Sequence, residues 1–102
     1  MEFSCALRNI LTKMIKKEID IINKLGLHAR AAAKFVTLAS VFDSDIQLER
    51  NGRKVNGKSI MGVMMLAAGK GSQLTLIVSG NDETEAVTGL ENLVAQRFGE
   101  KE

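Results

Sequence analysis

The rest of the chain is organised around GLHARAAA at residues 26–33, where a predicted strand gives way to a predicted helix. This stretch contains His28, the only histidine in the sequence, and Arg30 follows it two positions later. The helix is predicted over residues 29–39, because an alanine-rich sequence with spaced apolar side chains favours an amphipathic helix. His28 is therefore expected at the N-cap of that helix.

The composition indicates a single globular domain. The chain has 102 residues, of which 25% are charged and 45% hydrophobic, and this is typical of one folded domain. A net charge of +2 with no basic run argues against nucleic-acid binding. A lone cysteine, Cys5, excludes an internal disulfide and fits the cytoplasm. We expect no secretory signal and no membrane insertion, because no apolar run is long enough.

The hydrophobic pattern predicts an order of β-α-β-β-α-β-α. Residues 1–14 are interpreted as an N-terminal extension and residues 15–102 as the domain. Besides the helix at 29–39, the predicted elements are strands at 15–22, 45–49, 53–56 and 73–78, a helix at 60–68 and a last helix from Asp82 to Phe98. Half-buried strands favour an α+β fold, a four-stranded antiparallel sheet with its three helices on one face.

One turn signal and two helix-cap signals support these boundaries. Asn51-Gly52 separates the second and third predicted strands, and this dipeptide is a strong signal for a two-residue hairpin. Asp82 and Glu85 have the spacing of a capping box at the start of the last helix. Ser59 is similarly placed to cap the helix that begins at Ile60.

His28 has the chemistry of a phosphoryl acceptor. A neutral imidazole offers a ring nitrogen as a nucleophile. Backbone N–H groups at a helix start, here those of Arg30 and Ala31, bind anions well, and a guanidinium can hold phosphate oxygens. A lone histidine is more often an ordinary polar residue, so this pattern alone leaves both interpretations open. No metal site is expected, because there is no second histidine.

Together, GLHAR at 26–30 and VNGKSIMG at 55–62 resemble the HPr family of phosphocarrier proteins, over about residues 15–99. The resemblance implies an HPr-like open-faced β-sandwich. It also implies that enzyme I phosphorylates Nδ1 of His28 using phosphoenolpyruvate, that Arg30 binds the phosphate, and that an enzyme IIA domain accepts it. Such a protein is a stoichiometric carrier rather than an enzyme. It needs no cofactor, and we expect it to be a monomer.

The resemblance adds a regulatory site and a docking surface. It matches Ser59 to the serine that an HPr kinase/phosphorylase modifies with ATP. It also places Met61 and Met64, with Ala29 and Ile60, on the face that meets partner proteins. The sequence alone leaves the methionines open to a core role, although not all apolar side chains of so short a helix can point inward.

The sequence departs from the family pattern at two positions. The usual proline after the arginine is replaced by Ala31, and the chain has no proline at all. Alanine keeps an N–H that proline lacks but fixes the backbone less. Leu25 stands where many relatives have a small polar residue. Because alanine pre-organises the first turn less than proline does, we expect a working site with a slightly looser loop.

Parts of the sequence are also compatible with two rival functions. GRKVNGKS at residues 52–59 fits the Walker A pattern of nucleotide-binding loops. We reject it, because a hairpin explains these residues better and the preceding strand is not continuously apolar. A regulatory phosphoprotein of the nitrogen-related phosphotransferase branch would use the same histidine and stays open.

Overall fold

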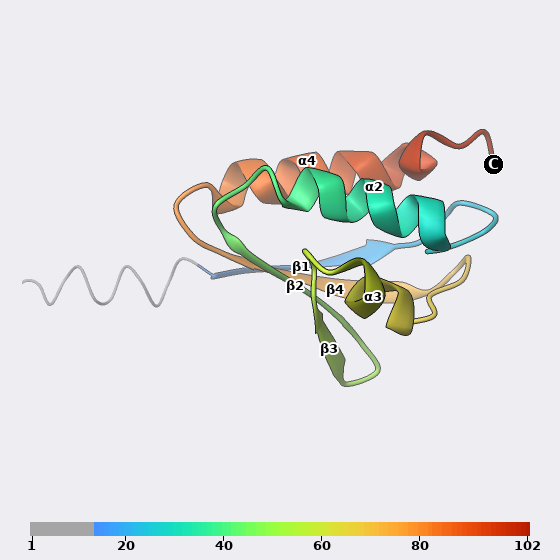
Figure 1. Cartoon of the computed structure of the whole chain (residues 1–102), viewed down its shortest axis with the longest axis horizontal. Helices are drawn as coiled ribbons and strands as arrows, with labels where there is room; N and C mark the ends of the chain where they lie inside the picture. The colour runs from blue at the N-terminus through green and yellow to red at the C-terminus, as the bar shows by residue number, and fades with distance from the viewer. Residues whose placement is uncertain (1–13) are drawn as a thin grey trace, which may run out of the picture.

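A computed structural model describes residues 14–102 and confirms the predicted α+β fold (Figure 1). Its elements are β1 (Met14–Asp20), α2 (Ala29–Ala39), β2 (Asp45–Arg50), β3 (Arg53–Asn56), α3 (Ile60–Met65), β4 (Gln73–Ser79) and α4 (Glu83–Ala95), followed by a 3-10 turn, Arg97–Gly99. Every helix in this part of the chain falls short of the length and apolar character that a membrane crossing needs.

The four strands form one antiparallel sheet in the order β1-β4-β2-β3. The register places Leu48 of β2 between Val55 of β3 and Leu76 of β4. Figure 1 shows α2 and α4 side by side along the sheet. Helix α3 packs against α2 and β3. The sheet is therefore open on its other face, as the predicted open-faced sandwich requires.

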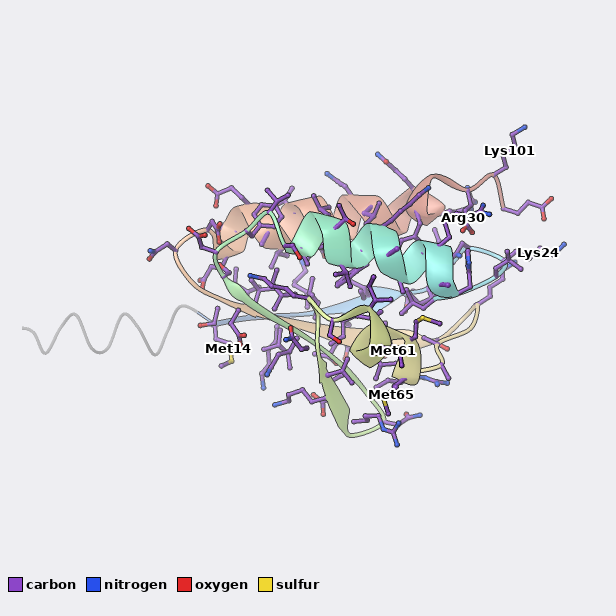
Figure 2. The ribbon with its side chains drawn as sticks, in the orientation of Figure 1. Met14, Lys24, Arg30, Met61, Met65 and Lys101 are labelled. Atoms are coloured by element: carbon purple, nitrogen blue, oxygen red, sulfur yellow. The ribbon has the colours of Figure 1, made fainter. Side chains whose placement is uncertain are left out.

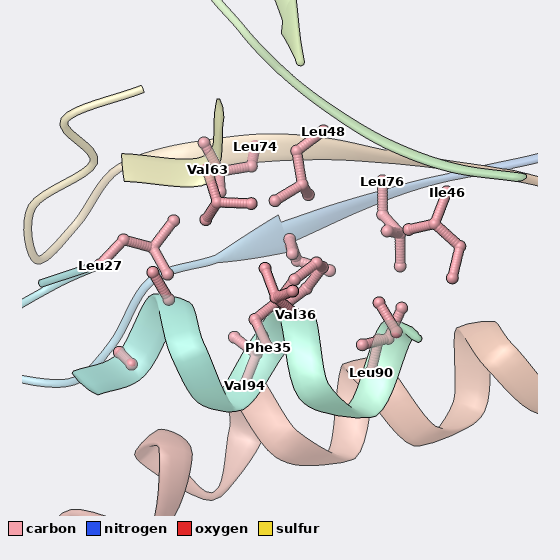
Figure 3. Packing of buried hydrophobic residues seen from close by; sticks show 14 of the residues in the cluster. Leu27, Phe35, Val36, Ile46, Leu48, Val63, Leu74, Leu76, Leu90 and Val94 are labelled. Atoms are coloured by element: carbon pink, nitrogen blue, oxygen red, sulfur yellow. The ribbon is translucent and has the colours of Figure 1, made fainter. Parts of the chain in front are cut away.

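The core fills the space between the sheet and the helices (Figure 3). Fully buried side chains come from every layer: Phe35 in α2, Leu48 in β2, Val63 in α3, Leu76 in β4 and Leu90 in α4. Burying one such side chain stabilises the fold by about 1.5–3 kcal/mol. Because α2, α3 and α4 all contribute side chains to it, the core fixes the three helices against the sheet.

The first strand and the second helix differ from their predicted limits. The strand begins at Met14, which pairs with Ser79, and ends at Asp20. The rest of the predicted extension lies outside the described residues. Helix α3 ends at Met65, not at residue 68, because the chain turns away at Ala67, whose φ is +51°. The Leu66 carbonyl accepts a hydrogen bond from Arg50 Nη1 at 2.8 Å instead of continuing the helix.

The last helix is broken before Phe98. Helix α4 ends at Ala95, and Arg97 and Phe98 both have left-handed backbones, with φ of +57° and +56°. This turn buries Phe98, which is only 1% exposed. The amine of Lys34 in α2 donates to the Phe98 carbonyl at 2.7 Å. Phe98, the last residue of the predicted helix, therefore lies outside α4 and reaches the core through this turn.

The predicted capping box at Asp82 is wrong. Asp82 makes no side-chain cap hydrogen bond to α4. Its carboxylate accepts the N–H of Asp43 at 2.8 Å, the N–H of Ser44 at 3.0 Å and the Ser44 hydroxyl at 2.5 Å. These bonds, that of the Ser44 hydroxyl first, hold the pKa of Asp82 below its usual value. Asp82 thus joins the α2–β2 loop to the start of α4.

Replacing Asp82 should make the fold less stable in a pH-dependent way. A carboxyl group whose pKa is lowered on folding stabilises the fold above its unfolded pKa, and this contribution is lost as the pH falls through its folded pKa. The Tm difference between wild type and Asp82→Ala should be constant from neutral pH to about pH 5 and shrink below about pH 4. Thermal unfolding followed by circular dichroism measures it. Asp45→Ala, which removes an exposed carboxylate, should show no such pH-dependent loss.

Candidate functional site

His28 lies at the N-cap of α2, as predicted. Its backbone is extended, with φ −75° and ψ 178°, and its carbonyl accepts the N–H of Ala32 at 2.8 Å. The ring turns back over the helix start, so that Nδ1 accepts the N–H of Arg30 at 3.3 Å. The side chain is 26% exposed. A ring nitrogen therefore faces the first helical turn while the imidazole remains open to solvent.

The loop before His28 fixes the position of the ring. Leu27 is buried, and its N–H donates to the Ala68 carbonyl at 2.8 Å. Gly26 has a φ of +69°, and its N–H donates to the Asn23 carbonyl at 3.2 Å. A Cβ at Gly26 would lie 2.5 Å from the Ala68 oxygen, so only glycine fits this close approach.

The carboxylate of Glu100 contacts the imidazole of His28 at Nε2, the ring nitrogen away from the start of α2. The sequence did not predict this residue. Its Oε2 is hydrogen-bonded to His28 Nε2, and its Oε1 accepts from Asn23 Nδ2 at 3.0 Å. Hydrogen bonds from Asn23 and then from His28 hold the pKa of Glu100 below its usual value. Glu100 lies 72 residues from His28, and no local pattern marks a pair so far apart.

Cationic side chains gather around this carboxylate. A surface pocket of about 400 Å³ is lined by Lys24, Arg30, Lys34 and Lys101 together with Glu100. Figure 2 shows Lys24, Arg30 and Lys101 at the same end of the molecule. Arg30 is exposed, so its guanidinium is available to an anion that approaches the start of α2. The first-turn N–H of Ala31 belongs to the same helix start.

Ser59 occupies the N-cap of α3, as the sequence predicted. Its Oγ accepts the N–H of Gly62 at 3.1 Å, and its backbone is extended, with φ −116° and ψ 118°. The side chain is only half-buried. The hydroxyl therefore has a structural role and lies near the surface.

An exposed apolar patch covers α3. Ile60, Met61, Met64 and Met65 are 43%, 71%, 38% and 58% exposed, whereas Val63 points into the core. Met61 and Met65 are labelled in Figure 2. The predicted docking residues Ile60, Met61 and Met64 are thus at the surface, and Ala29 beside His28 is exposed too.

The Walker-like segment is not shaped as a nucleotide-binding loop. Residues 53–56 of the Walker-like segment form strand β3, and Lys58 Nζ donates to the Phe42 carbonyl at 2.7 Å. The segment is thus a hairpin and not a phosphate-binding loop. Across residues 14–102, no three or more His, Cys, Asp or Glu side chains are grouped to hold a metal ion.

Comparisons with known proteins agree on one family. The family model described as "PTS HPr component phosphorylation site" matches residues 15–96. The chain is 58% identical to the phosphocarrier protein HPr of Cupriavidus necator over 89 residues, covering 87% of this chain and 100% of that protein.

Solved structures give the same result. The crystal structure of HPr-C-His from Thermoanaerobacter tengcongensis matches with a TM-score of 0.83 and 46% identity, over 86% of this chain and 99% of that one. A second structure from that organism, of an HPr dimer, matches with a TM-score of 0.69 and 50% identity, over 80% and 94%. The monomer expected for this chain stays a prediction.

The loop geometry predicts a specific effect of Gly26→Ala. The added Cβ clashes with the Ala68 carbonyl in an already left-handed backbone, so the free energy of unfolding should fall by about 1–3 kcal/mol. Urea denaturation measures this loss. The matched control is Gly71→Ala, where φ is +90° but no atom lies within 4 Å of the new Cβ. Equal losses in the two variants would contradict the importance of the close approach at Gly26.

Proposed function

The chain belongs to the HPr family of phosphocarrier proteins of the phosphotransferase system, and on that premise we propose that His28 is its phosphoryl acceptor. In this proposal, enzyme I transfers a phosphoryl group from phosphoenolpyruvate to Nδ1 of His28, and an enzyme IIA domain then accepts it. The observation that carries the proposal is the contact of Nδ1 with the Arg30 N–H, 3.3 Å away at the start of α2.

The start of α2 suits a phosphoryl group on Nδ1. Such a group brings about two negative charges at neutral pH. The N–H groups of Arg30 and Ala31 lie in the first turn, where backbone donors and the helix dipole favour an anion. The Arg30 guanidinium can add two parallel hydrogen bonds to phosphate oxygens. The protein supplies a stable but exposed carrier for the group and performs no turnover of its own.

The proposed docking surface combines apolar and cationic side chains. Ala29, Ile60, Met61 and Met64 offer an adaptable apolar area, since methionine side chains can repack against different partners. The hydrogen bond from Leu27 to Ala68 ties the chain after α3 to the loop that holds His28. Lysines near Arg30 would favour acidic partner surfaces. We expect the protein to act as a monomer in the cytoplasm.

Ser59 is proposed as a second phosphorylation site, used by an HPr kinase/phosphorylase with ATP. Its half-buried hydroxyl borders the exposed apolar patch of α3. A phosphate there would place negative charge on the docking surface, which would weaken binding to an acidic partner. This site would regulate the carrier, whereas His28 would carry the transferred group.

Labelling with phosphoenolpyruvate and enzyme I tests the carrier proposal. Wild type should gain an acid-labile, base-stable phosphate, His28→Ala should gain none, and Ser59→Ala should be labelled normally. Arg30→Ala should be labelled about 10- to 100-fold more slowly, because a charged hydrogen-bonding group is lost. Lys54→Ala, which removes an exposed cation from β3, is the matched control. Normal labelling of His28→Ala would show that another residue is the acceptor.

The Ser59 proposal makes separate predictions for stability and modification. Ser59→Ala should lower the free energy of unfolding by about 0.5–2 kcal/mol through loss of the cap, as measured by urea denaturation. It should also abolish labelling by the kinase and ATP, as measured by intact-protein mass spectrometry. Ser40→Ala, which changes an exposed serine at the end of α2, should alter neither result. Full kinase labelling of Ser59→Ala would rule out the site.

A further inference from the structure

Both ring nitrogens of His28 have a hydrogen-bonding neighbour within the chain. Nδ1 lies 3.3 Å from the Arg30 nitrogen, and Nε2 contacts the Glu100 carboxylate. A backbone N–H can only donate, and an ionised carboxylate can only accept. The neutral imidazole satisfies both neighbours in one tautomer alone, with its proton on Nε2 and its lone pair on Nδ1.

Glu100 is itself held in place by a buried amide. Asn23 has no exposed surface, and its Nδ2 donates both to Glu100 Oε1, at 3.0 Å, and to the Gly26 carbonyl, at 2.8 Å. One side chain therefore fixes the carboxylate and the loop that leads to His28. The Glu100 side chain is only 13% exposed, so its hydrogen bonds compete with little water.

The segment that carries Glu100 is anchored on its other side by the core. Phe98 is buried, and its carbonyl accepts a hydrogen bond from the Lys34 amine at 2.7 Å. The left-handed turn at Arg97 and Phe98 directs the following residues toward the start of α2. The contact between Glu100 and His28 thus follows from several fixed points and not from a single flexible side chain.

We propose that Glu100 is a positioning residue for phosphoryl acceptance, which keeps the proton of His28 on Nε2 and stabilises the imidazolium formed when Nδ1 is phosphorylated. The inference rests on the proposed function of His28. It assigns to Glu100 the part that the carboxylate plays in a Ser-His-Asp triad, where it orients the imidazole and balances its charge.

Phosphorylation of His28 in this proposal requires no proton to leave the imidazole ring. The Nδ1 lone pair forms a bond to phosphorus as the bond between phosphorus and the donor protein breaks, and the electron pair of that bond stays with the donor. The ring then carries the phosphoryl group on Nδ1 and a proton on Nε2, with a positive charge shared between them. Glu100 accepts the hydrogen bond from Nε2 throughout. Return of the electron pair to Nδ1 on transfer to an acceptor restores the starting state.

The negative charge of Glu100 does not oppose the incoming phosphoryl group. The carboxylate contacts Nε2, whereas the phosphoryl group would bond to Nδ1 and meet the Arg30 N–H. Lys24, Arg30, Lys34 and Lys101 line the pocket beside Glu100, together with Glu102, which pairs with Lys24. Cationic side chains therefore outnumber the two carboxylates there. The site can therefore hold one carboxylate and one phosphoryl group on different edges of a single ring.

Nitrogen-15 NMR of the full chain tests the tautomer directly. His28 is the only histidine, so its ring signals are unambiguous. At a pH where the ring is neutral, wild type should show a larger Nε2–H fraction than a histidine in a short unstructured peptide. Glu100→Ala should lower that fraction toward the peptide value. Glu102→Ala removes the same charge from an exposed pair with Lys24 and should leave the fraction unchanged.

Phosphorylation kinetics with phosphoenolpyruvate and enzyme I test the consequence. With the Glu100→Ala variant as its substrate, enzyme I should show a kcat about three- to tenfold lower and little change in KM. The reason is the loss of an interaction that strengthens in the transition state. Glu102→Ala should match wild type. Thermal unfolding of both variants verifies that each is folded.

The inference requires both effects in Glu100→Ala and neither in Glu102→Ala. An unchanged tautomer, an unchanged rate, or equal changes in the two variants would overturn it. Failure of the proposed function itself is distinguishable, because wild type would then take no phosphoryl group on His28 from enzyme I.

Discussion

The burial of Leu27 is the constraint on which the site depends. Its side chain lies in the core, and its N–H is bonded to the Ala68 carbonyl. The next residue, His28, must then leave the core at the point where α2 begins. Its ring is therefore partly exposed, and the N–H groups of the first helical turn lie close to it. Packing thus places the imidazole of His28 at the start of α2, between the Arg30 N–H and the Glu100 carboxylate.

Much of the fold could be predicted, because its signals are local. Strands β1, β2 and β4 follow from alternating apolar side chains, and the β2–β3 turn follows from Asn51-Gly52. The predictions failed where tertiary contacts overrode a local pattern. Asp82 had the spacing of a capping residue, but Ser44 and the backbone of the α2–β2 loop take its carboxylate. Phe98 was predicted as the last residue of the helix, yet it reaches the core only after the helix has ended.

The site residues likewise include some that local sequence patterns predict and some that only tertiary contacts bring together. His28 and Ser59 were predicted at helix starts from sequence alone, and both side chains accept a first-turn N–H there. The chemistry of these positions is contained within a few consecutive residues. Glu100 and Asn23 could not be found, because their roles arise only when the chain after α4 returns to the loop before α2. An acidic residue after a glycine is too common to signal such a contact.

The reversal of backbone handedness after α4 has a consequence for how this protein can vary. Three successive residues, Arg97 to Gly99, have positive φ and set the direction of the segment that follows. One residue inserted there would shift everything beyond it by up to about 3.5 Å, which exceeds the tolerance of a hydrogen bond. Evolution can therefore exchange side chains along the outside of this segment more freely than it can change the segment's length.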